Sequence, residues 1–209
     1  MKKTYSILRA AQEKEISKLT LGGEILDVGG DATSTYQKLI AGSSNIHSIN
    51  ISPEYHPDEI VDIETTFPYS DATYDHVICF NVLEHIVETQ HAISEMVRVV
   101  KPGGQIVITT PFLYYIHGSP DDYQRYTSSF YKKMAEKYGC TVESITPLGS
   151  GFLSIGFSFI GGVLPTLWFK LFCKSIVCSL DAGLCRISSK YRKLTDRLPM
   201  GYFVVFTKD

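Results

Sequence analysis

One polar segment of the sequence combines a histidine, a carboxylate and a guanidinium. His117 precedes Asp122, and Arg125 follows closely. A histidine titrates near neutral pH, so a carboxylate that orients it makes it a candidate acceptor of a hydroxyl proton. The same carboxylate can instead pair with Arg125 and only fix the conformation of a loop. The sequence leaves both interpretations open.

Small and polar residues also follow several apolar runs, at the points where predicted strands end. The first run ends in a glycine pair, which permits a sharp turn and lets the main chain approach a ligand. Ligands of open α/β sheets collect at the carboxyl ends of strands. The candidate binding residues are therefore those at four strand ends: Asp27, Gly29, Gly30 and Asp31; Asn50; Asp62 and Ile63; Asn81, Leu83 and His85.

The strand ends belong to a chain in which strands and helices alternate. Such alternation predicts an α/β fold with parallel pairing and right-handed crossovers. Residues 1–22 form an N-terminal helical segment, with its helix over residues 5–19. Further helices are predicted over residues 34–41, 88–100 and 128–138, and strands over residues 24–29, 46–51, 59–63, 76–80, 105–110, 141–146 and 202–207.

Composition bounds the class of protein. With 209 residues, 44% hydrophobic and 20% charged, the chain fits a single globular domain over residues 1–209. A formal charge of −2 gives no reason to expect a nucleic acid as partner, because phosphate-dominated binding needs a basic face. The N-terminus lacks the apolar core of a signal peptide, so a cytoplasmic protein is expected.

The cysteines indicate reduced thiols rather than a disulfide framework, because their number is odd. The spacing of the last three matches no common zinc pattern, so no metal is expected. The five are Cys79, Cys140, Cys173, Cys178 and Cys185.

An apolar insertion over residues 149–200 separates the last two predicted strands. Residues 152–169 carry no charged side chain. Three interpretations stay open: a helical pair that covers the site or forms a homodimer, a segment over residues 152–174 that contacts a membrane peripherally, and a membrane span. A basic cluster over residues 186–197 favours contact with anionic lipid.

Three blocks of sequence, in order, carry a family resemblance. They are Glu24-Ile-Leu-Asp-Val-Gly-Gly-Asp31, Tyr74-Asp-His-Val-Ile-Cys-Phe-Asn-Val-Leu-Glu-His85 and Val99-Val-Lys-Pro-Gly-Gly104. Together they resemble class I S-adenosylmethionine-dependent methyltransferases of the methyltransferase type 11-like group. The resemblance implies a Rossmann-like fold: a mostly parallel seven-stranded sheet with helices on both faces and an antiparallel last strand. An NAD-binding domain needs G-x-G-x-x-G, which the chain lacks.

The resemblance also implies S-adenosylmethionine as the cofactor. Asp27 is expected to orient the methionine ammonium group above the Gly29-Gly30 main chain. Asp62 is expected to accept a hydrogen bond from the adenine amino group, with Ile63 against the ring. The remaining residues lie beside the sulfonium: Asn81, Leu83 and His85.

The chain departs from the family at three cofactor positions. Asp31 and Thr33 stand where the second and third glycines of the turn belong, and Asn50 replaces the acidic residue that grips the ribose. An amide lacks the charge-assisted strength of a carboxylate. A catalytically inactive, cofactor-binding or scaffold domain is therefore an alternative.

Residues 110–127 resemble a methyltransferase subgroup associated with surface-polysaccharide biosynthesis, although Asp121 and Gln124 stand where relatives have His and Trp. The resemblance implies O-methylation of a small-molecule acceptor, a sugar or other polar molecule in surface-glycan biosynthesis, such as a glycan or glycolipid. His117 is then the candidate base. The alternative acceptor is a lipid or quinone-like small molecule.

Overall fold

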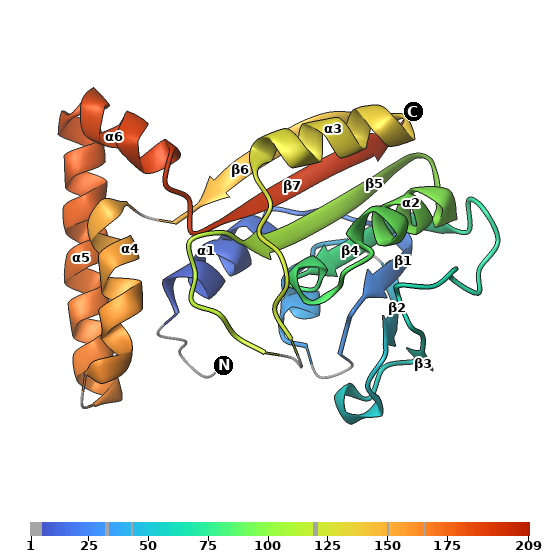
Figure 1. Cartoon of the computed structure of the whole chain (residues 1–209), viewed down its shortest axis with the longest axis horizontal. Coiled ribbons are helices and arrows are strands. Elements are labelled where there is room, and N and C mark those ends of the chain that lie inside the picture. Colours follow the sequence, from blue (N-terminus) through green and yellow to red (C-terminus); the bar gives the residue numbers. More distant parts are fainter. Residues whose placement is uncertain (1–5, 32–33, 43, 119–120, 150, 165) are drawn as a thin grey trace.

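The computed structural model describes residues 6–31, 34–42, 44–118, 121–149, 151–164 and 166–209. Within this part, seven strands form one sheet in the order β3-β2-β1-β4-β5-β7-β6 (Figure 1). Neighbouring strands are parallel except around β7, which runs antiparallel to β5 and β6. The predicted fold class is therefore confirmed. The strands are β1 (Gly23–Val28), β2 (Ser44–Asn50), β3 (Glu59–Ile60), β4 (Tyr74–Phe80), β5 (Val100–Pro111), β6 (Cys140–Leu148) and β7 (Gly201–Lys208).

The central strands bury side chains on both faces of the sheet. In β4, Val77 and Cys79 belong to one core and Ile78 and Phe80 to the other, as the alternation of side chains along a strand requires. Helices α2 (Thr89–Val99) and α3 (Ser128–Tyr138) pack on the first core, and α1 (Ile7–Ile16) packs on the second (Figure 1). Burial on both faces explains why β4 is a nearly continuous apolar run.

The helix predicted over residues 34–41 was wrong in extent. The structure forms only a 3-10 turn, η1 (Tyr36–Leu39). Ala41 leaves this turn to pair with the chain ahead of β1. Its N–H donates to the carbonyl of Leu19 at 3.0 Å, and its carbonyl accepts from the N–H of Leu21 at 2.9 Å. These two main-chain bonds replace a continued helix.

Strand β5 begins before residue 105, where the sequence predicted it. Val100 directly follows α2 and already pairs with Tyr74, and regular pairing resumes where Gln105 faces His76. Between them, Gly103 adopts a left-handed φ of 76°. Glycine takes this conformation without steric cost, which allows the strand to bulge. The Lys-Pro-Gly-Gly segment is thus an irregular strand start as well as a helix stop.

The apolar insertion forms a helical hairpin beyond one end of the sheet (Figure 1). Its elements are α4 (Phe152–Ile160), η4 (Gly161–Val163), α5 (Leu167–Ile187) and α6 (Ser189–Asp196). Among the described residues, no helix is both long enough and apolar enough to cross a membrane.

A buried carboxylate joins the three helices of the insertion. Asp181 of α5 is 0% exposed and accepts from the N–H groups of Leu153 at 3.1 Å and Ser154 at 2.7 Å. These donors belong to the first turn of α4, which has no side-chain cap of its own at Gly151. The hydroxyl of Tyr191 in α6 donates to the same carboxylate. Asp181 thus satisfies N–H groups that the start of a helix leaves without partners.

We expect Asp181→Ala to lower the free energy of unfolding by about 1–3 kcal/mol, because it removes a helix cap and leaves buried donors unpaired. Chemical denaturation of the purified protein measures this. Asp196→Ala, at the exposed end of α6, is the matched control and should change that free energy by less than about 0.5 kcal/mol. Equal values for the two variants would contradict the capping role.

Candidate cofactor and acceptor site

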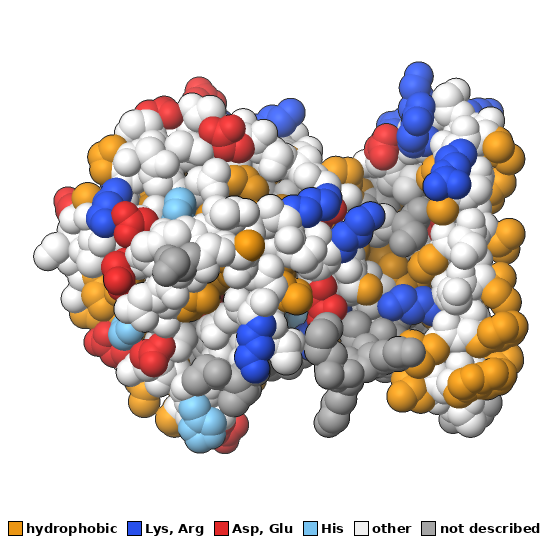
Figure 2. Space-filling view, turned by 180° about the vertical axis from the view of Figure 1, so that it is seen from behind, with side chains coloured by type: hydrophobic (Ala, Val, Ile, Leu, Met, Phe, Trp, Pro, Cys, Tyr) orange, Lys and Arg blue, Asp and Glu red, His pale blue; other side chains and the backbone are white. Residues whose placement is uncertain are grey.

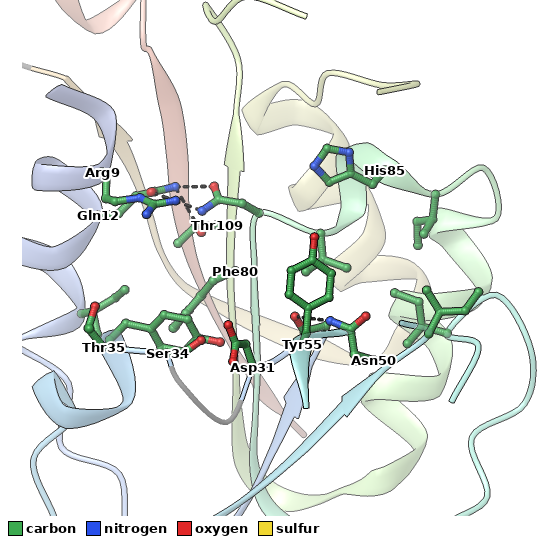
Figure 3. A pocket seen from close by; sticks show the side chains of 18 of the residues that line it. Arg9, Gln12, Asp31, Ser34, Thr35, Asn50, Tyr55, Phe80, His85 and Thr109 are labelled. Carbon is green, nitrogen blue, oxygen red and sulfur yellow. Dashed lines mark hydrogen bonds between the residues drawn. The ribbon is translucent and has the colours of Figure 1, made fainter. Parts of the chain in front are cut away.

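A cavity of about 640 Å³ opens at the carboxyl ends of β1, β2 and β4 (Figure 3). A pocket of this size is typical of a small-molecule site. Parallel strands bring their carboxyl ends to one edge of the sheet, so the topology itself places polar loop residues around this space. The lining residues are Arg9, Gln12, Glu13, Ile16, Gly29, Asp31, Ser34, Thr35, Tyr36, Asn50, Ile51, Tyr55, Asp62, Ile63, Glu64, Phe80, Asn81, Val82, His85, Ile86, Thr109 and Tyr123.

Most of the predicted cofactor residues line this cavity. Three do not: Asp27 and Leu83 are 0% exposed, and Gly30 packs directly against Asp27. Thr33 lies outside the described residues. Those that line the cavity are Gly29, Asp31, Asn50, Asp62, Ile63, Asn81 and His85.

Asp27 lies beneath the glycine turn and is already hydrogen-bonded. Its Oδ2 accepts from the hydroxyl of Tyr36 at 2.8 Å and from the amide of Gln37 at 2.9 Å. Its Oδ1 has no hydrogen-bond partner among the described residues. Burial raises the pKa of Asp27 to about 6, against the opposing effect of the two donors. Through these two hydrogen bonds Asp27 fixes the turn η1 against the end of β1.

The turn after β1 requires glycine. Gly29 has a φ of 75°, and a Cβ placed there would lie 2.3 Å from Val82 Cγ2. The N–H of Gly29 donates to the carbonyl of Ile49 at 2.8 Å, which ties the turn to β2. Because no side chain covers it, the main chain of the turn faces the cavity directly.

Asn50 holds the same turn from the end of β2. Its Nδ2 donates to the carbonyls of Gly29 at 3.1 Å and Gly30 at 3.2 Å, while its Oδ1 accepts from the N–H of Ser52 at 3.0 Å. A carboxylate cannot donate to these carbonyls. The asparagine that departs from the family pattern therefore has a structural role in this chain.

Asp62 and Ile63 form the far wall of the cavity after β3. Asp62 is exposed, and its Oδ1 accepts from the N–H of Glu64 at 3.0 Å. Ile63 is 6% exposed and belongs to the core on the α2 side. The wall thus combines a carboxylate with an apolar surface, a pairing that suits a flat heterocycle with an exocyclic amine.

Helix α1 contributes residues that the sequence analysis missed. Gln12 is 4% exposed, and its amide donates to the side chains of Asn81 and Thr109 (Figure 3). Asn81 itself has a left-handed φ of 56°, which is uncommon for a residue with a side chain. A signal for Gln12 was present, because it lies at helical spacing between Leu8 and Ile16 on the apolar face of the predicted helix.

The structure brings His117, Asp122 and Arg125 together. Asp122 is almost fully buried and pairs with both terminal nitrogens of Arg125, with Nη2 to Oδ2 at 2.7 Å. The N–H of His117 donates to Asp122 Oδ2 at 3.0 Å, and its Nδ1 lies 3.1 Å from the same oxygen. The guanidinium holds the pKa of Asp122 well below its usual range. The carboxylate therefore forms the ion pair with Arg125 and holds the main chain of His117, whereas His117 Nδ1 makes no hydrogen bond to the described residues.

This acceptor loop, residues 112–127, is anchored beside the cavity. The carbonyl of Glu84 accepts from the N–H of Tyr123 at 2.8 Å, and the carbonyl of Leu83 accepts from the hydroxyl of Tyr126 at 2.7 Å. The ring of His85, which lines the cavity, lies 5.0 Å from that of His117, centroid to centroid. His117 thus stands next to the cavity without lining it.

Comparisons with known proteins agree with this architecture. Residues 26–108 match the family described as "Methyltransferase domain". A ubiquinone biosynthesis O-methyltransferase of Rickettsia akari is 30% identical over 120 residues, which cover 49% of this chain and 44% of the relative. The chain spans about half the length of the curated relatives it matches.

Two solved structures share the fold. An S-adenosylmethionine-dependent methyltransferase from Listeria monocytogenes superposes with a TM-score of 0.60 at 13% identity, over 96% of this chain and 99% of that one. Phosphoethanolamine N-methyltransferase 2 of Haemonchus contortus, solved with S-adenosyl-L-methionine, gives a TM-score of 0.58 at 17% identity, over 94% of this chain and 52% of that one. Residues 26–108 therefore resemble the methyltransferase domain family in sequence, and the whole sheet has the Rossmann-like fold that these solved methyltransferases share.

Proposed function

We propose that this protein is an S-adenosylmethionine-dependent methyltransferase that methylates an oxygen of a polar small molecule, with a sugar of a surface glycan as the acceptor. The observation that carries the proposal is the cavity of about 640 Å³ at the strand ends, with His117 and its carboxylate partner beside it. The matched family supports the methyl transfer, and the sequence of the acceptor loop supports the glycan.

The residues around the cavity fit the cofactor. The bare main chain at Gly29 suits the methionine end, and the pair of Asp62 and Ile63 suits the adenine end. Asn50 also lines the cavity. Its Oδ1 already accepts from the N–H of Ser52 and can accept a second hydrogen bond, from a ribose hydroxyl. When bound, S-adenosylmethionine would supply the methyl group: an acceptor oxygen would bond to the methyl carbon while the carbon–sulfur bond breaks and its electron pair stays on sulfur.

The acceptor side is polar and aromatic. The rings of Tyr114 and Tyr115 stack at 4.2 Å between centroids, and both lie within 6.2 Å of the His117 ring. Tyr123 lines the cavity and is exposed. Flat aromatic faces with hydroxyl groups at their edges bind sugars through apolar contact and hydrogen bonds. In this proposal the acceptor hydroxyl lies between these rings and the cofactor cavity.

A second candidate acceptor is a quinone-type molecule. The matched Rickettsia akari relative is named as a ubiquinone biosynthesis O-methyltransferase, and another, of Mycolicibacterium paratuberculosis, as a demethylmenaquinone methyltransferase. In this interpretation the exposed apolar side chains of α5 contact the membrane that holds such a lipid-soluble substrate. The third candidate, a cofactor-binding scaffold without turnover, rests on the departures at Asp31, Thr33 and Asn50.

The exposed stripe on α5 consists of apolar side chains at helical spacing: Trp168, Phe172, Ile176 and Leu180. Figure 2 shows hydrophobic side chains along the outer edge of the insertion, with Lys and Arg at its upper end. The exposed cations near that end are Arg186, Lys190, Arg192, Lys193 and Arg197. Apolar residues next to cations match the surface of an anionic membrane, so we propose that the cytoplasmic protein docks there to reach a lipid-linked acceptor.

Cofactor binding is the first prediction of this proposal. Isothermal titration with S-adenosylmethionine should give a Kd between about 1 µM and 1 mM, the usual range for enzyme substrates. Asp62→Ala should weaken binding about tenfold, because one hydrogen bond to the adenine amine is lost. Asp196→Ala, outside the cavity, should bind as the wild type does. No detectable heat at millimolar cofactor would contradict the enzyme and favour a scaffold.

A second prediction concerns His117. His117→Ala should lower turnover of a labelled methyl group by about 10²–10⁴-fold, the usual contribution of a side chain that acts on the transferred proton. Cofactor affinity should stay unchanged, because His117 does not line the cavity. The matched control is His91→Ala on α2, which should retain wild-type turnover. Full activity of the His117 variant would exclude a role in the reaction.

Membrane docking predicts that the protein co-sediments with vesicles of mixed zwitterionic and anionic phospholipid. Binding should fall when salt screens the cations, and the double variant Trp168→Ser with Phe172→Ser should reduce it at least tenfold. Analytical ultracentrifugation without lipid tests the alternative, in which the stripe is a homodimer interface. A stable dimer that the double variant abolishes, together with no vesicle binding by the wild type, would assign the stripe to a homodimer interface.

A further inference from the structure

Three potential metal ligands meet where the acceptor loop reaches the cavity wall. One ligand atom from each of Glu84, His85 and His117 lies within 4.8 Å of the others, and His85 Nε2 is 3.8 Å from Glu84 Oε1. Glu84 and His85 belong to the turn η3 (Leu83–His85), which follows β4, whereas His117 comes from the acceptor loop. The cysteines gave no reason to expect a metal, and only folding brings His117 to the adjacent Glu84 and His85.

Glu84 is the most unusual member of the group. It is 0% exposed, and neither carboxylate oxygen has a hydrogen-bond partner among the described residues. An unpaired buried carboxylate is costly, and natural proteins keep one mainly where it binds a charge or performs chemistry. The hydrogen bonds and ion pair of Asp122 show that the neighbouring carboxylate is already satisfied by Arg125 and His117. Of these two carboxylates, Glu84 is therefore the one without a hydrogen-bond partner among the described residues, and it is the candidate ligand of a cation.

His85 has the second neighbour that metal-bound histidines use. His85 Nδ1 hydrogen-bonds the main-chain carbonyl of Asp121, which places the proton on Nδ1 and leaves Nε2 towards Glu84. A carbonyl partner of this kind fixes the tautomer and orientation of a metal-bound histidine, as it does here for His85. His117 Nδ1 lies 3.1 Å from the carboxylate of Asp122 but makes no hydrogen bond to the described residues, so one buried ring nitrogen of this histidine is also left without a partner.

We propose that Glu84, His85 and His117 bind a divalent transition-metal ion, with Zn²⁺ as the best match. Two imidazoles and one carboxylate suit Zn²⁺ and similar ions, and a site with three protein ligands leaves positions open for another oxygen. The His117 side chain is 30% exposed, which gives the ion and an acceptor oxygen access from solvent.

The role of the ion rests on the proposed function. An acceptor hydroxyl bound at the open position would be held beside the cavity, and it would release its proton to water more readily because the ion stabilises the oxygen anion. With the ion bound, His117 is a metal ligand in place of the proton acceptor named above, and the loss of turnover expected for His117→Ala then follows from loss of the ion. The site therefore favours acceptors with two adjacent oxygens, such as a vicinal diol or a catechol, which can chelate the ion.

The test is metal binding by the full chain after treatment with a chelator. Titration with Zn²⁺, followed by mass spectrometry of the metal content after desalting, should give about one ion per chain. Glu84→Gln and His117→Asn should each lower the affinity by at least 10- to 100-fold, the range reported even for loss of a supporting residue. His91→Asn is the matched control for binding by other histidines and should retain wild-type affinity.

The proposal is overturned if wild type binds no stoichiometric Zn²⁺ or Mn²⁺, or if the two ligand variants bind as tightly as wild type. Circular dichroism of each variant verifies the fold. If a ligand variant fails to fold, Asp122→Asn replaces it in the test, because this variant leaves all three ligands in place and should still weaken metal binding. Titration with S-adenosylmethionine on the metal-free protein keeps the two proposals separate. Metal binding without cofactor binding would contradict the proposed function and support the metal site. Cofactor binding without metal binding would contradict the metal site and support the proposed function.

Discussion

The reversal of the chain at Gly29 is the constraint on which the site depends. The left-handed glycine, with Val82 packed where a Cβ would stand, allows β1 to end in bare main chain at the cavity. The amide of Asn50 donates to two carbonyls of that turn, and the carbonyl of Ile49 accepts from its N–H. Asp27, at the end of β1, accepts a hydrogen bond from Tyr36. The floor of the cavity is thus set by main-chain geometry that few side chains can replace. Everything that we assign to the cofactor lies around this floor.

The acceptor loop depends on a different kind of interaction, a buried ion pair. Asp122 holds Arg125 and His117 at once, and the main chain of Glu84 and Leu83 fixes the loop next to η3. Breaking one partner of such a pair leaves a buried charge uncompensated, which is far more costly than the pair itself is stabilising. The two sides of the site therefore meet at η3. Its residues line the cavity through His85, anchor the loop through two carbonyls, and bring the unpaired Glu84 carboxylate to the junction.

Much of this arrangement could be predicted from the sequence. The apolar runs that became β1, β4 and β7 predicted buried strands, because a strand buried on both faces leaves little freedom in its composition. The polar residues at strand ends followed from the same reasoning. Gln12 was missed because a single amide on an apolar helix face gives a weak signal. The Glu84–His85–His117 cluster was missed because His117 lies far along the chain from the adjacent Glu84 and His85. The role of Asn50 could not be predicted from the sequence, because its amide donates to the carbonyls of Gly29 and Gly30, which only the fold brings next to it.

Hydrogen exchange of the main-chain amides, with and without S-adenosylhomocysteine, tests the central claim most directly. A ligand that binds at the strand ends buries the main chain there and slows local opening. The account predicts slower exchange at residues 28–31, 50–52, 61–64 and 81–86, from four separate segments, with little change in α4 to α6. No protection at saturating ligand, or protection confined to the helical insertion, would contradict a cofactor site at the Gly29 turn.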